Sequence, residues 1–371
     1  TTYGSRIYAD HVPTVDDPIV RRLKDAGAII LGKTNTPEFG AGANTTNEVF
    51  GATRNPCDDA LTSGGSSGGS SAAVATGMAP LATGSDLGGS LRIPASFCGV
   101  VGFRASAGWV PAPNRMLGYS PLWVEGPIAR TVGDAKLLFG ALFGYDRSDP
   151  LSHPEFPGDQ GAPSLKKIRV GVSVGLGATE VEAEVRDAFT RTCEMFQDVF
   201  KEVIPLDLDL SACHEIFRVL RGEDIVAAHG DRPSDEMVML GDNIRANLDE
   251  AASITFDERA RAGGQHSEFA RAFQALFNEI DVLICPTCAI KPFPVTQNHP
   301  TEINGVELEQ YYSWYALTYA LSLTGSPAIS LPVGNFLDGL PFGLQVVMQR
   351  DKDWELLSTA ASIEGYIHQR V

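Results

Sequence analysis

The feature that most limits the fold of this 371-residue chain is a recurring unit, in which a helical apolar pattern is followed by a short apolar run. Residues 18–26 (PIVRRLKDA) have the helical spacing, Gly27 ends that pattern, and residues 28–31 (AIIL) predict a buried strand. Further segments fit the same scheme, with a strand at residues 168–173 and helix–strand units at residues 184–206 and 269–286. This alternation predicts an α/β fold with a mixed, largely parallel central sheet covered by helices on both faces.

One stretch interrupts this pattern. The chain is 43% hydrophobic and 20% charged, which is typical of a globular protein with a sizeable core. Residues 146–161 are rich in proline and charge and predict a surface excursion. We expect the strands on its two sides to complete one sheet, so residues 1–371 are predicted to form a single domain. A boundary between two domains at this stretch is the alternative.

Charge and cysteine usage limit the partners. The formal net charge of −17 argues against attraction to phosphate backbones or anionic membranes, so no nucleic acid or membrane partner is expected. The six cysteines are scattered and predict reduced thiols. Residues 285–288 (CPTC) have redox spacing, but they follow an apparent strand and lack a second pair for zinc, so neither metal nor cofactor is expected. With no membrane-spanning run and no signal peptide at TTYGSRIYAD, we expect a cytoplasmic protein.

Two short motifs match known patterns in the wrong context. Residues 27–34 (GAIILGKT) fit the phosphate-loop pattern, but the middle of the motif is the predicted strand and Pro37 follows closely, so nucleotide binding is not expected. Residues 64–69 (GGSSGG) contain GxSxG twice, yet the preceding residues are polar rather than a buried strand. A Ser-His-Asp triad is therefore the weaker alternative.

Two glycine–serine stretches suggest chemistry. Residues 63–71 (SGGSSGGSS) lead directly into the small, helix-compatible residues AAVATGM, which a flexible linker rarely does. A second Gly-Gly-Ser, at residues 88–90, ends 24 residues after Ser66. Glycines allow successive N–H groups to converge on one oxygen, and such groups beside a serine provide the nucleophile and oxyanion hole of acyl transfer. For either stretch alone, a tight turn without catalytic function is the alternative.

Together these motifs resemble the amidase signature family, serine hydrolases that cleave amide and related bonds. The similarity covers nearly the whole chain, at residues 32–40, 55–56, 64–75, 84–103 and 126–135, and more loosely at 281–287 and 324–334. The resemblance implies the amidase signature fold and hydrolysis of a small-molecule amide, carbamate (including urethane) or ester. It implies no cofactor.

The resemblance also implies roles residue by residue. Ser90 is the expected nucleophile, and Ser66, preceded by a cis peptide bond from Gly65, is the expected relay between nucleophile and base. The implied oxyanion-hole donors are the backbone N–H groups of Leu87, Gly88, Gly89 and Ser90. The implied supporting residues are Ser67, Asp86 and Arg92, although an ordinary buried ion pair is the alternative for the last two. Residues expected beside the scissile bond are Gly40, Ala41, Gly42 and Ser85.

The family's third catalytic residue, a lysine, has no counterpart in this sequence. In the family it lies upstream of the segment that resembles TTYGSR, where this chain starts, and Lys33 aligns with a later motif. We therefore expect the chain to lack an N-terminal segment that holds the lysine. The alternatives are that the missing part belongs to another chain, or that the protein is a catalytically silent binding protein on the same scaffold.

Aromatic and apolar residues predict the substrate class. The candidates for an acyl or aryl pocket are Met116, Leu117, Tyr119, Trp123, Tyr311, Tyr312, Trp314 and Tyr315, with core packing or subunit contact as the alternative. Such a pocket favours small aryl or alkyl substrates. A glutamine-hydrolysing amidotransferase subunit is a further alternative, although residues 84–99 and 342–349 are more similar to the stand-alone enzymes. A homodimer is also left open.

Overall fold

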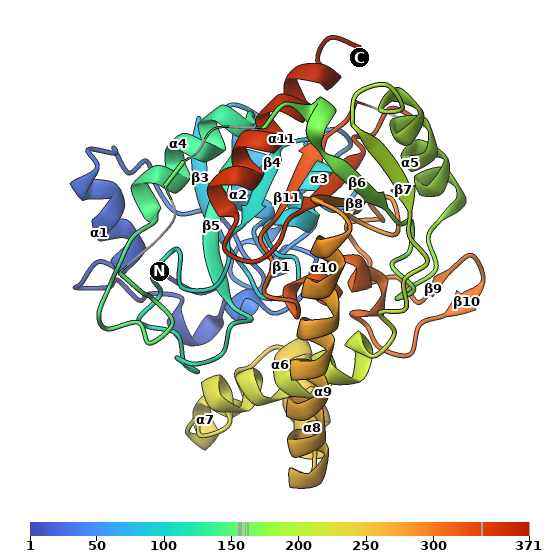
Figure 1. Cartoon of the computed structure of the whole chain (residues 1–371). Coiled ribbons are helices and arrows are strands. Elements are labelled where there is room, and N and C mark those ends of the chain that lie inside the picture. The colour runs from blue at the N-terminus through green and yellow to red at the C-terminus, as the bar shows by residue number, and fades with distance from the viewer. Residues whose placement is uncertain (155–157, 160, 162, 335–336, 371) are drawn as a thin grey trace.

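A computed structural model describes residues 1–154, 158–159, 161, 163–334 and 337–370. Its centre is an eight-stranded sheet (Figure 1). In spatial order the strands are β3 (Leu81–Asp86), β5 (Val124–Ala129), β4 (Val101–Arg104), β11 (Ala328–Pro332), β12 (Gly343–Val347), β8 (Val282–Pro286), β6 (Arg169–Val172) and β7 (Glu202–Pro205).

The α/β class and the mixed sheet are confirmed, but the expectation of a largely parallel sheet is wrong. Five neighbouring strand pairs are antiparallel, and two, β6 with β7 and β6 with β8, are parallel. Antiparallel strands need no crossover helix, and β11 pairs directly with β12, the next strand along the chain. An apolar run in the sequence indicates burial but carries no strand direction, so the pattern could not have predicted this arrangement.

Helices cover both faces of the sheet, as expected. A Cβ placed on Gly102 of β4 would lie 2.7 Å from the Ala95 Cβ of α3 (Arg92–Cys98), whereas the next residue, Phe103, packs against Phe139 of α4 (Val132–Leu142). Successive strand residues point to opposite faces, so α3 and α4 lie on opposite sides of the sheet. Helix α2 (Gly68–Ala75) packs beside α3, and α11 (Asp353–Ile367) packs beside α4.

A second group of helices extends away from the sheet, at the bottom of Figure 1. It comprises α6 (Cys213–His229), α7 (Ser234–Met237), α8 (Asp242–Ala252) and α9 (Phe256–Ala275), and α10 (Ala316–Ser322) packs against α6. The remaining elements of four or more residues are α1 (Pro18–Asp25) and α5 (Ala183–Met195), while β1 (Thr46–Asn47) with β2 (Gly51–Ala52) and β9 (Glu302–Ile303) with β10 (Val306–Glu307) form two short ribbons. Among the helices that the structure describes, none combines the length and apolar character needed to cross a membrane.

The locally predicted elements agree with the structure at most positions. Helices α1, α5 and α9 and strands β6, β7 and β8 lie where the sequence pattern predicts them. The strand predicted at residues 28–31 is wrong, because this segment belongs to no described strand and exposes 86% of Ile29 and 70% of Leu31. Strands from both sides of residues 146–161 join the same sheet, and residues 155–157 and 160 of that stretch lie outside the described residues.

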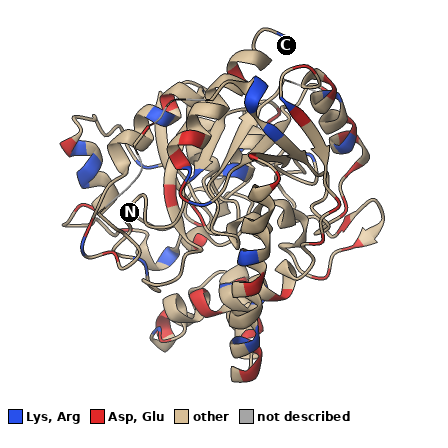
Figure 2. Cartoon of the chain, viewed as in Figure 1, with Lys and Arg blue, Asp and Glu red and all other residues tan. Residues whose placement is uncertain are grey.

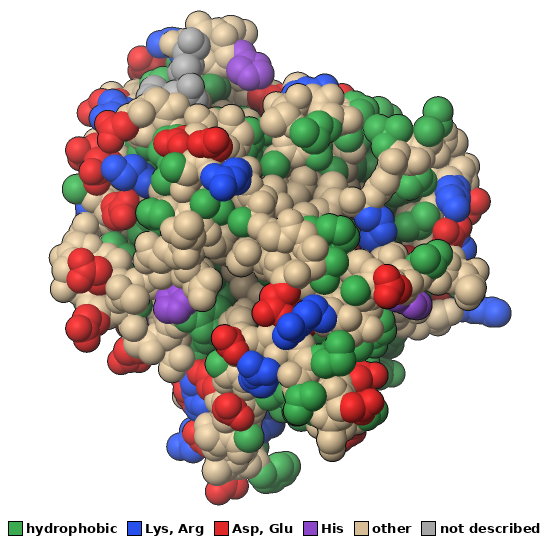
Figure 3. All heavy atoms as spheres, turned by 180° about the vertical axis from the view of Figure 1, so that it is seen from behind, with side chains coloured by type: hydrophobic (Ala, Val, Ile, Leu, Met, Phe, Trp, Pro, Cys, Tyr) green, Lys and Arg blue, Asp and Glu red, His purple; other side chains and the backbone are tan. Residues whose placement is uncertain are grey.

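Charged side chains are distributed over the surface rather than collected by sign. In the ribbon of Figure 2 acidic and basic residues are interspersed along the helices, and the reverse face in Figure 3 mixes side chains of both signs with scattered hydrophobic ones. On the face that Figure 3 shows, the described basic residues form no continuous patch.

Candidate active site

A cavity of about 270 Å³ opens beside the two glycine–serine turns. Its walls include both serines that the family resemblance singles out, Ser66 and Ser90. They also include further expected site residues, namely Gly40, Ala41, Gly42, Ser85, Leu87 and Gly88. Residues that lie far apart in the sequence therefore meet at one hollow that is large enough for a small organic molecule.

The two turns are held together by hydrogen bonds. The peptide bond between Gly65 and Ser66 is cis, as the resemblance implies. The N–H of Ser67 donates to the carbonyl of Ser90 over 3.2 Å, which links the turn before α2 to the turn before α3. The Ser67 hydroxyl also donates to the Ser85 carbonyl and accepts from the Ser85 N–H, both over 3.3 Å. Ser67 thus fixes the position of Ser66 relative to Ser90.

Glycine is required at positions 88 and 89 by close neighbours. A Cβ on Gly89 would lie 2.3 Å from the Thr318 Oγ1, and Gly89 adopts a φ of +136° that other residues rarely reach. A Cβ on Gly88 would lie 2.8 Å from the Phe217 Cζ. The Thr318 hydroxyl lies 2.6 Å from the Gly88 carbonyl and 2.8 Å from the Tyr315 carbonyl, and it donates to one of them at a time. Helices α6 and α10 therefore press directly on this turn.

The backbone N–H groups of the turn differ in their partners. The Gly89 N–H donates to the Asp86 Oδ1 over 2.8 Å. Within the described part of the chain, the N–H groups of Leu87, Gly88 and Ser90 have no hydrogen-bond acceptor. Three of the four expected oxyanion-hole donors are thus free in this structure, and Gly89 would contribute only after giving up its bond to Asp86. The four-donor hole remains a prediction.

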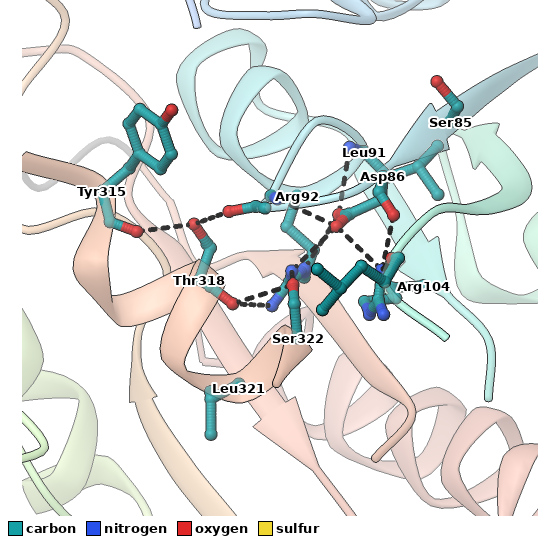
Figure 4. Close-up of polar contacts among 12 residues, drawn as sticks. Ser85, Asp86, Leu91, Arg92, Arg104, Tyr315, Thr318, Leu321 and Ser322 are labelled. Atoms are coloured by element: carbon teal, nitrogen blue, oxygen red, sulfur yellow. Dashed lines mark hydrogen bonds and ion pairs between the residues drawn. The ribbon is translucent and has the colours of Figure 1, made fainter. Parts of the chain in front are cut away.

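Asp86 is the centre of a fully buried ion cluster (Figure 4). Its carboxylate accepts from the Arg92 Nη2 over 2.9 Å, from the Arg92 Nε over 3.0 Å and from the Arg104 Nη1 over 3.2 Å. Arg92 also donates to the Thr318 carbonyl over 3.0 Å and to the Ser322 hydroxyl over 2.7 Å. Burial favours the neutral acid, but the charges of Arg92 and Arg104 outweigh it and lower the pKa of Asp86 to about 2.

The cluster positions the backbone around the candidate nucleophile. Asp86 accepts from the N–H groups of Gly89 and Leu91, the residues on either side of Ser90. Both arginines are almost fully buried, with 0% and 1% of their surface exposed. The ordinary buried ion pair, which was the alternative for Asp86 and Arg92, is therefore present and at the same time fixes the Ser90 turn.

His229 is the histidine that lines the cavity among the described residues. Its Nδ1 accepts from the Arg232 Nε over 3.2 Å, and because arginine can only donate, the neutral ring carries its proton on Nε2. Burial, with the charge of Arg232, lowers the pKa of His229 to about 4. In a Ser-His-Asp triad the Nδ1–H faces a carboxylate and the bare Nε2 faces the serine, so this arrangement disfavours that alternative.

Helix α6 supplies a wall that the sequence did not predict. Its residues Phe217, Arg221, Asp224, Ile225 and His229 line the cavity, although none was a candidate. The first four follow helical i, i+4, i+7 and i+8 spacing, but they mix polar and apolar types and therefore do not stand out as a core-facing stripe. Only the tertiary contact with the Gly88 turn identifies this face as part of the site.

The aromatic candidates divide into two groups. Met116, Trp123 and Tyr315 line the cavity. Tyr312 and Trp314 are each 1% exposed and belong to the core, whereas Tyr119 is 81% exposed. Leu117 and Tyr311 are not among the lining residues. Five of the eight candidates thus do not line the cavity, and burial in the core accounts for two of these five.

Comparison with known proteins identifies the family. A family model described as Amidase matches residues 1–357. The chain is 33% identical over 376 residues to an acylamidase of Rhodococcus erythropolis, covering 98% of this chain and 78% of that protein. It is 32% identical over 397 residues to a glutamyl-tRNA(Gln) amidotransferase subunit of Trichodesmium erythraeum, covering 98% of this chain and 80% of the relative.

Solved structures agree. A bacterial aryl acylamidase of the amidase signature enzymes superposes with a TM-score of 0.87 at 28% identity, covering 96% of this chain and 76% of that one. A 6-aminohexanoate cyclic dimer hydrolase superposes with a TM-score of 0.81 at 26% identity, covering 99% and 81%. The sheet, the serine turns and these matches show that the chain belongs to the amidase signature family, a family of hydrolases that cleave amide bonds.

Proposed function

We propose that this protein hydrolyses amide bonds of small aryl or alkyl substrates through an acyl-enzyme on Ser90. The observation that carries the proposal is the shared cavity, in which Ser66, Ser90 and the free N–H groups of the Gly88 turn face the apolar side chains of Trp123 and Phe217. A nucleophile, an oxyanion hole and an apolar pocket are the parts that acyl transfer from a small amide needs.

The proposed chemistry proceeds in two halves. The Ser90 hydroxyl attacks the scissile carbonyl while its proton passes to Ser66 and onward to a base, and the free N–H groups stabilise the tetrahedral oxyanion. Ser66 then delivers a proton to the departing amine, and water hydrolyses the acyl-enzyme. The family resemblance implies a neutral lysine as the base. Among the described residues, no lysine lines this cavity.

The substrate range follows from the walls. The side chains of Met116, Trp123, Phe217, Ile225 and Tyr315 are apolar or aromatic over most of their surface, which suits an acyl or aryl group. Carbamates and esters form the same tetrahedral oxyanion, so the proposal extends to them. The acylamidase and aryl acylamidase relatives support the choice of an amide.

Labelling with a fluorophosphonate tests the nucleophile. We expect the full-length protein to react covalently at Ser90, Ser90→Ala to show no labelling, and Ser66→Ala to react roughly 100-fold or more slowly, because proton transfer typically contributes 10²–10⁴. Ser253→Ala, at an exposed serine on the end of α8, is the matched control and should react at the wild-type rate. Labelling that persists in Ser90→Ala would contradict the assignment.

A substrate panel separates the alternatives. Turnover of anilides and alkyl amides supports the proposal, whereas turnover confined to glutamine would favour an amidotransferase subunit, which the relatives named as such support. No turnover and no Ser90 labelling across amides, carbamates and esters would indicate a catalytically silent binding protein on this scaffold.

A further inference from the structure

One face of α6 runs along the cavity. Phe217, Arg221 and Asp224 line it at helical spacing i, i+4 and i+7. Phe217 touches the turn of the free N–H groups, since a Cβ on Gly88 would lie 2.8 Å from its Cζ. Seven residues of helix rise roughly 10 Å, so Asp224 lies about that far along the helix from Phe217, the residue that touches the Gly88 turn.

Asp224 has an unused oxygen beside this cavity. Its Oδ2 is buried and has no hydrogen-bond partner among the residues that the structure describes. Arg115 also lines the cavity, and its Nη2 donates to Asp149 over 2.7 Å. The buried Nε of Arg115 likewise has no hydrogen-bond partner in the described chain. A buried polar atom without a partner destabilises the protein, and a ligand group that donates or accepts the missing hydrogen bond removes that penalty.

The surrounding charges decide which kind of ligand group suits Asp224. Burial and the neighbouring Glu223 raise the pKa of Asp224 to about 7, against the opposing effects of Ser120, Arg115 and Arg221. Arg221 is a buried cation whose nearest carboxylate, on Glu250, is 3.9 Å away. A positively charged ligand group would meet these two guanidinium groups together with a carboxyl that is partly neutral. A neutral O–H or N–H donor avoids that repulsion.

We propose that Asp224 is a specificity-determining residue that pairs with a neutral hydroxyl or amide N–H carried by the substrate well beyond its scissile carbonyl. This inference rests on the proposed function, because it takes Ser90 as the point of attack. It narrows the substrate class from any small aryl or alkyl amide to those with one polar group about 10 Å from the reacting end. Sites that hydrogen-bond a substrate group reject analogues that lack it.

Matched ligands test the pairing without turnover. In Ser90→Ala, calorimetry would compare anilides of 3-(4-hydroxyphenyl)propionic acid and 3-(4-methylphenyl)propionic acid, and of the 4-(ammoniomethyl) analogue. We expect the hydroxyl compound to bind about tenfold more tightly than the methyl compound, the size expected for one hydrogen bond to a buried group, and the ammonium compound to bind most weakly.

Variants assign the effect to Asp224. Asp224→Leu removes both carboxylate oxygens while keeping a side chain of similar size. Added to Ser90→Ala, it should bring the ratio of the affinities for the hydroxyl and methyl compounds to about one. Asp224→Asn retains an oxygen acceptor and should keep a preference for the hydroxyl. Glu215→Gln is the control, since Glu215 pairs with Arg218 on an exposed part of α6 and is not a lining residue, and its ratio should be unchanged.

The outcomes separate this inference from the proposed function. A ratio that is the same with and without Asp224→Leu, tighter binding of the ammonium compound, or no binding of any compound overturns the role of Asp224. Absence of turnover in the wild-type protein, with the tenfold preference intact in Ser90→Ala, overturns the hydrolase function instead and leaves the Asp224 site standing.

Discussion

At the scale of single residues, Asp86 connects the candidate nucleophile to the core. Its two oxygens accept from backbone N–H groups on both sides of Ser90 and from two buried arginines. A carboxylate in this setting cannot be replaced by a neutral group without leaving cations unpaired. The same side chain therefore affects both the stability of the fold and the geometry of the Gly88 turn.

Asp86→Asn should lower the free energy of unfolding by about 3–5 kcal/mol at pH 7, because Arg92 and Arg104 would remain buried without a counter-charge. Since the pKa of Asp86 is lowered from 3.8 to about 2 on folding, its contribution is present above pH 4 and is lost as the pH falls from about 4 to 2. Urea unfolding measures the change.

Asp16→Asn is the control for this prediction, because Asp16 pairs with Lys24 at 2.7 Å on the exposed surface, and such pairs contribute about 0–1 kcal/mol. A loss in Asp86→Asn no larger than that in Asp16→Asn would show that the cluster does not hold the turn.

The sequence predicted the residues of the reactive turns but not the cluster's other partners. Ser66, Ser90, Asp86 and Arg92 lie within one contiguous motif region, which a family resemblance can recognise. Arg104, Ser322 and Gln345 reach the same ion cluster from β4, α10 and β12. Such contacts depend on how strands and helices pack against one another, and the spacing of residues along the sequence does not predict that packing.

At the scale of elements, α10 sets the shape of the oxyanion turn through one hydroxyl. Thr318→Val preserves the side-chain shape but removes the donor to the Gly88 carbonyl. We expect labelling of Ser90 by a fluorophosphonate to slow by at least about tenfold, although less than the 10²–10³ typical of deleting one oxyanion donor, because the N–H groups remain but lose their fixed placement.

Thr318→Ser keeps the hydroxyl and should be labelled at close to the wild-type rate, which separates the donor from the packing of the methyl group. Circular dichroism and thermal unfolding confirm that both variants fold. If Thr318→Val and the wild type are labelled at equal rates, the Thr318 hydroxyl does not hold the Gly88 turn in place.

The elements themselves were predictable where the pattern was local. Helical spacing found α1, α5 and α9, and short apolar runs found β6 and β8. The same reasoning failed at residues 28–31, because an apolar run becomes a strand only when a neighbouring strand takes up its backbone hydrogen bonds. Likewise, the wall formed by α6 depends on the contact between Phe217 and Gly88, which brings together residues far apart in the chain.

At the scale of the whole molecule, burial of carboxyl groups makes stability depend on pH. Burial raises the pKa of Glu125 on β5 to about 8, of Asp224 on α6 to about 7 and of Asp353 on α11 to about 7. In the unfolded chain these groups ionise near pH 4. Between about pH 4 and about pH 7 to 8, the folded protein therefore holds protons that the unfolded chain has released.

Unfolding in the range pH 6.5–8 thus releases protons, so the free energy of unfolding should fall as the pH rises from 6.5 to 8. His229, which burial keeps neutral in the folded state, acts in the opposite direction, because the unfolded histidine is still partly protonated near pH 6.5, but this contribution is smaller and fades as the pH rises further. Glu125→Gln should reduce the fall by up to roughly 1.5 kcal/mol, the integral for one group titrating at about 8. Urea unfolding at pH 6.5, 7.2 and 8.0 measures the free energy of unfolding of each variant, and Glu309→Gln, at an exposed glutamate, is the control. If the free energy of unfolding falls equally with pH in both variants, Glu125 ionises as freely in the folded protein as in water.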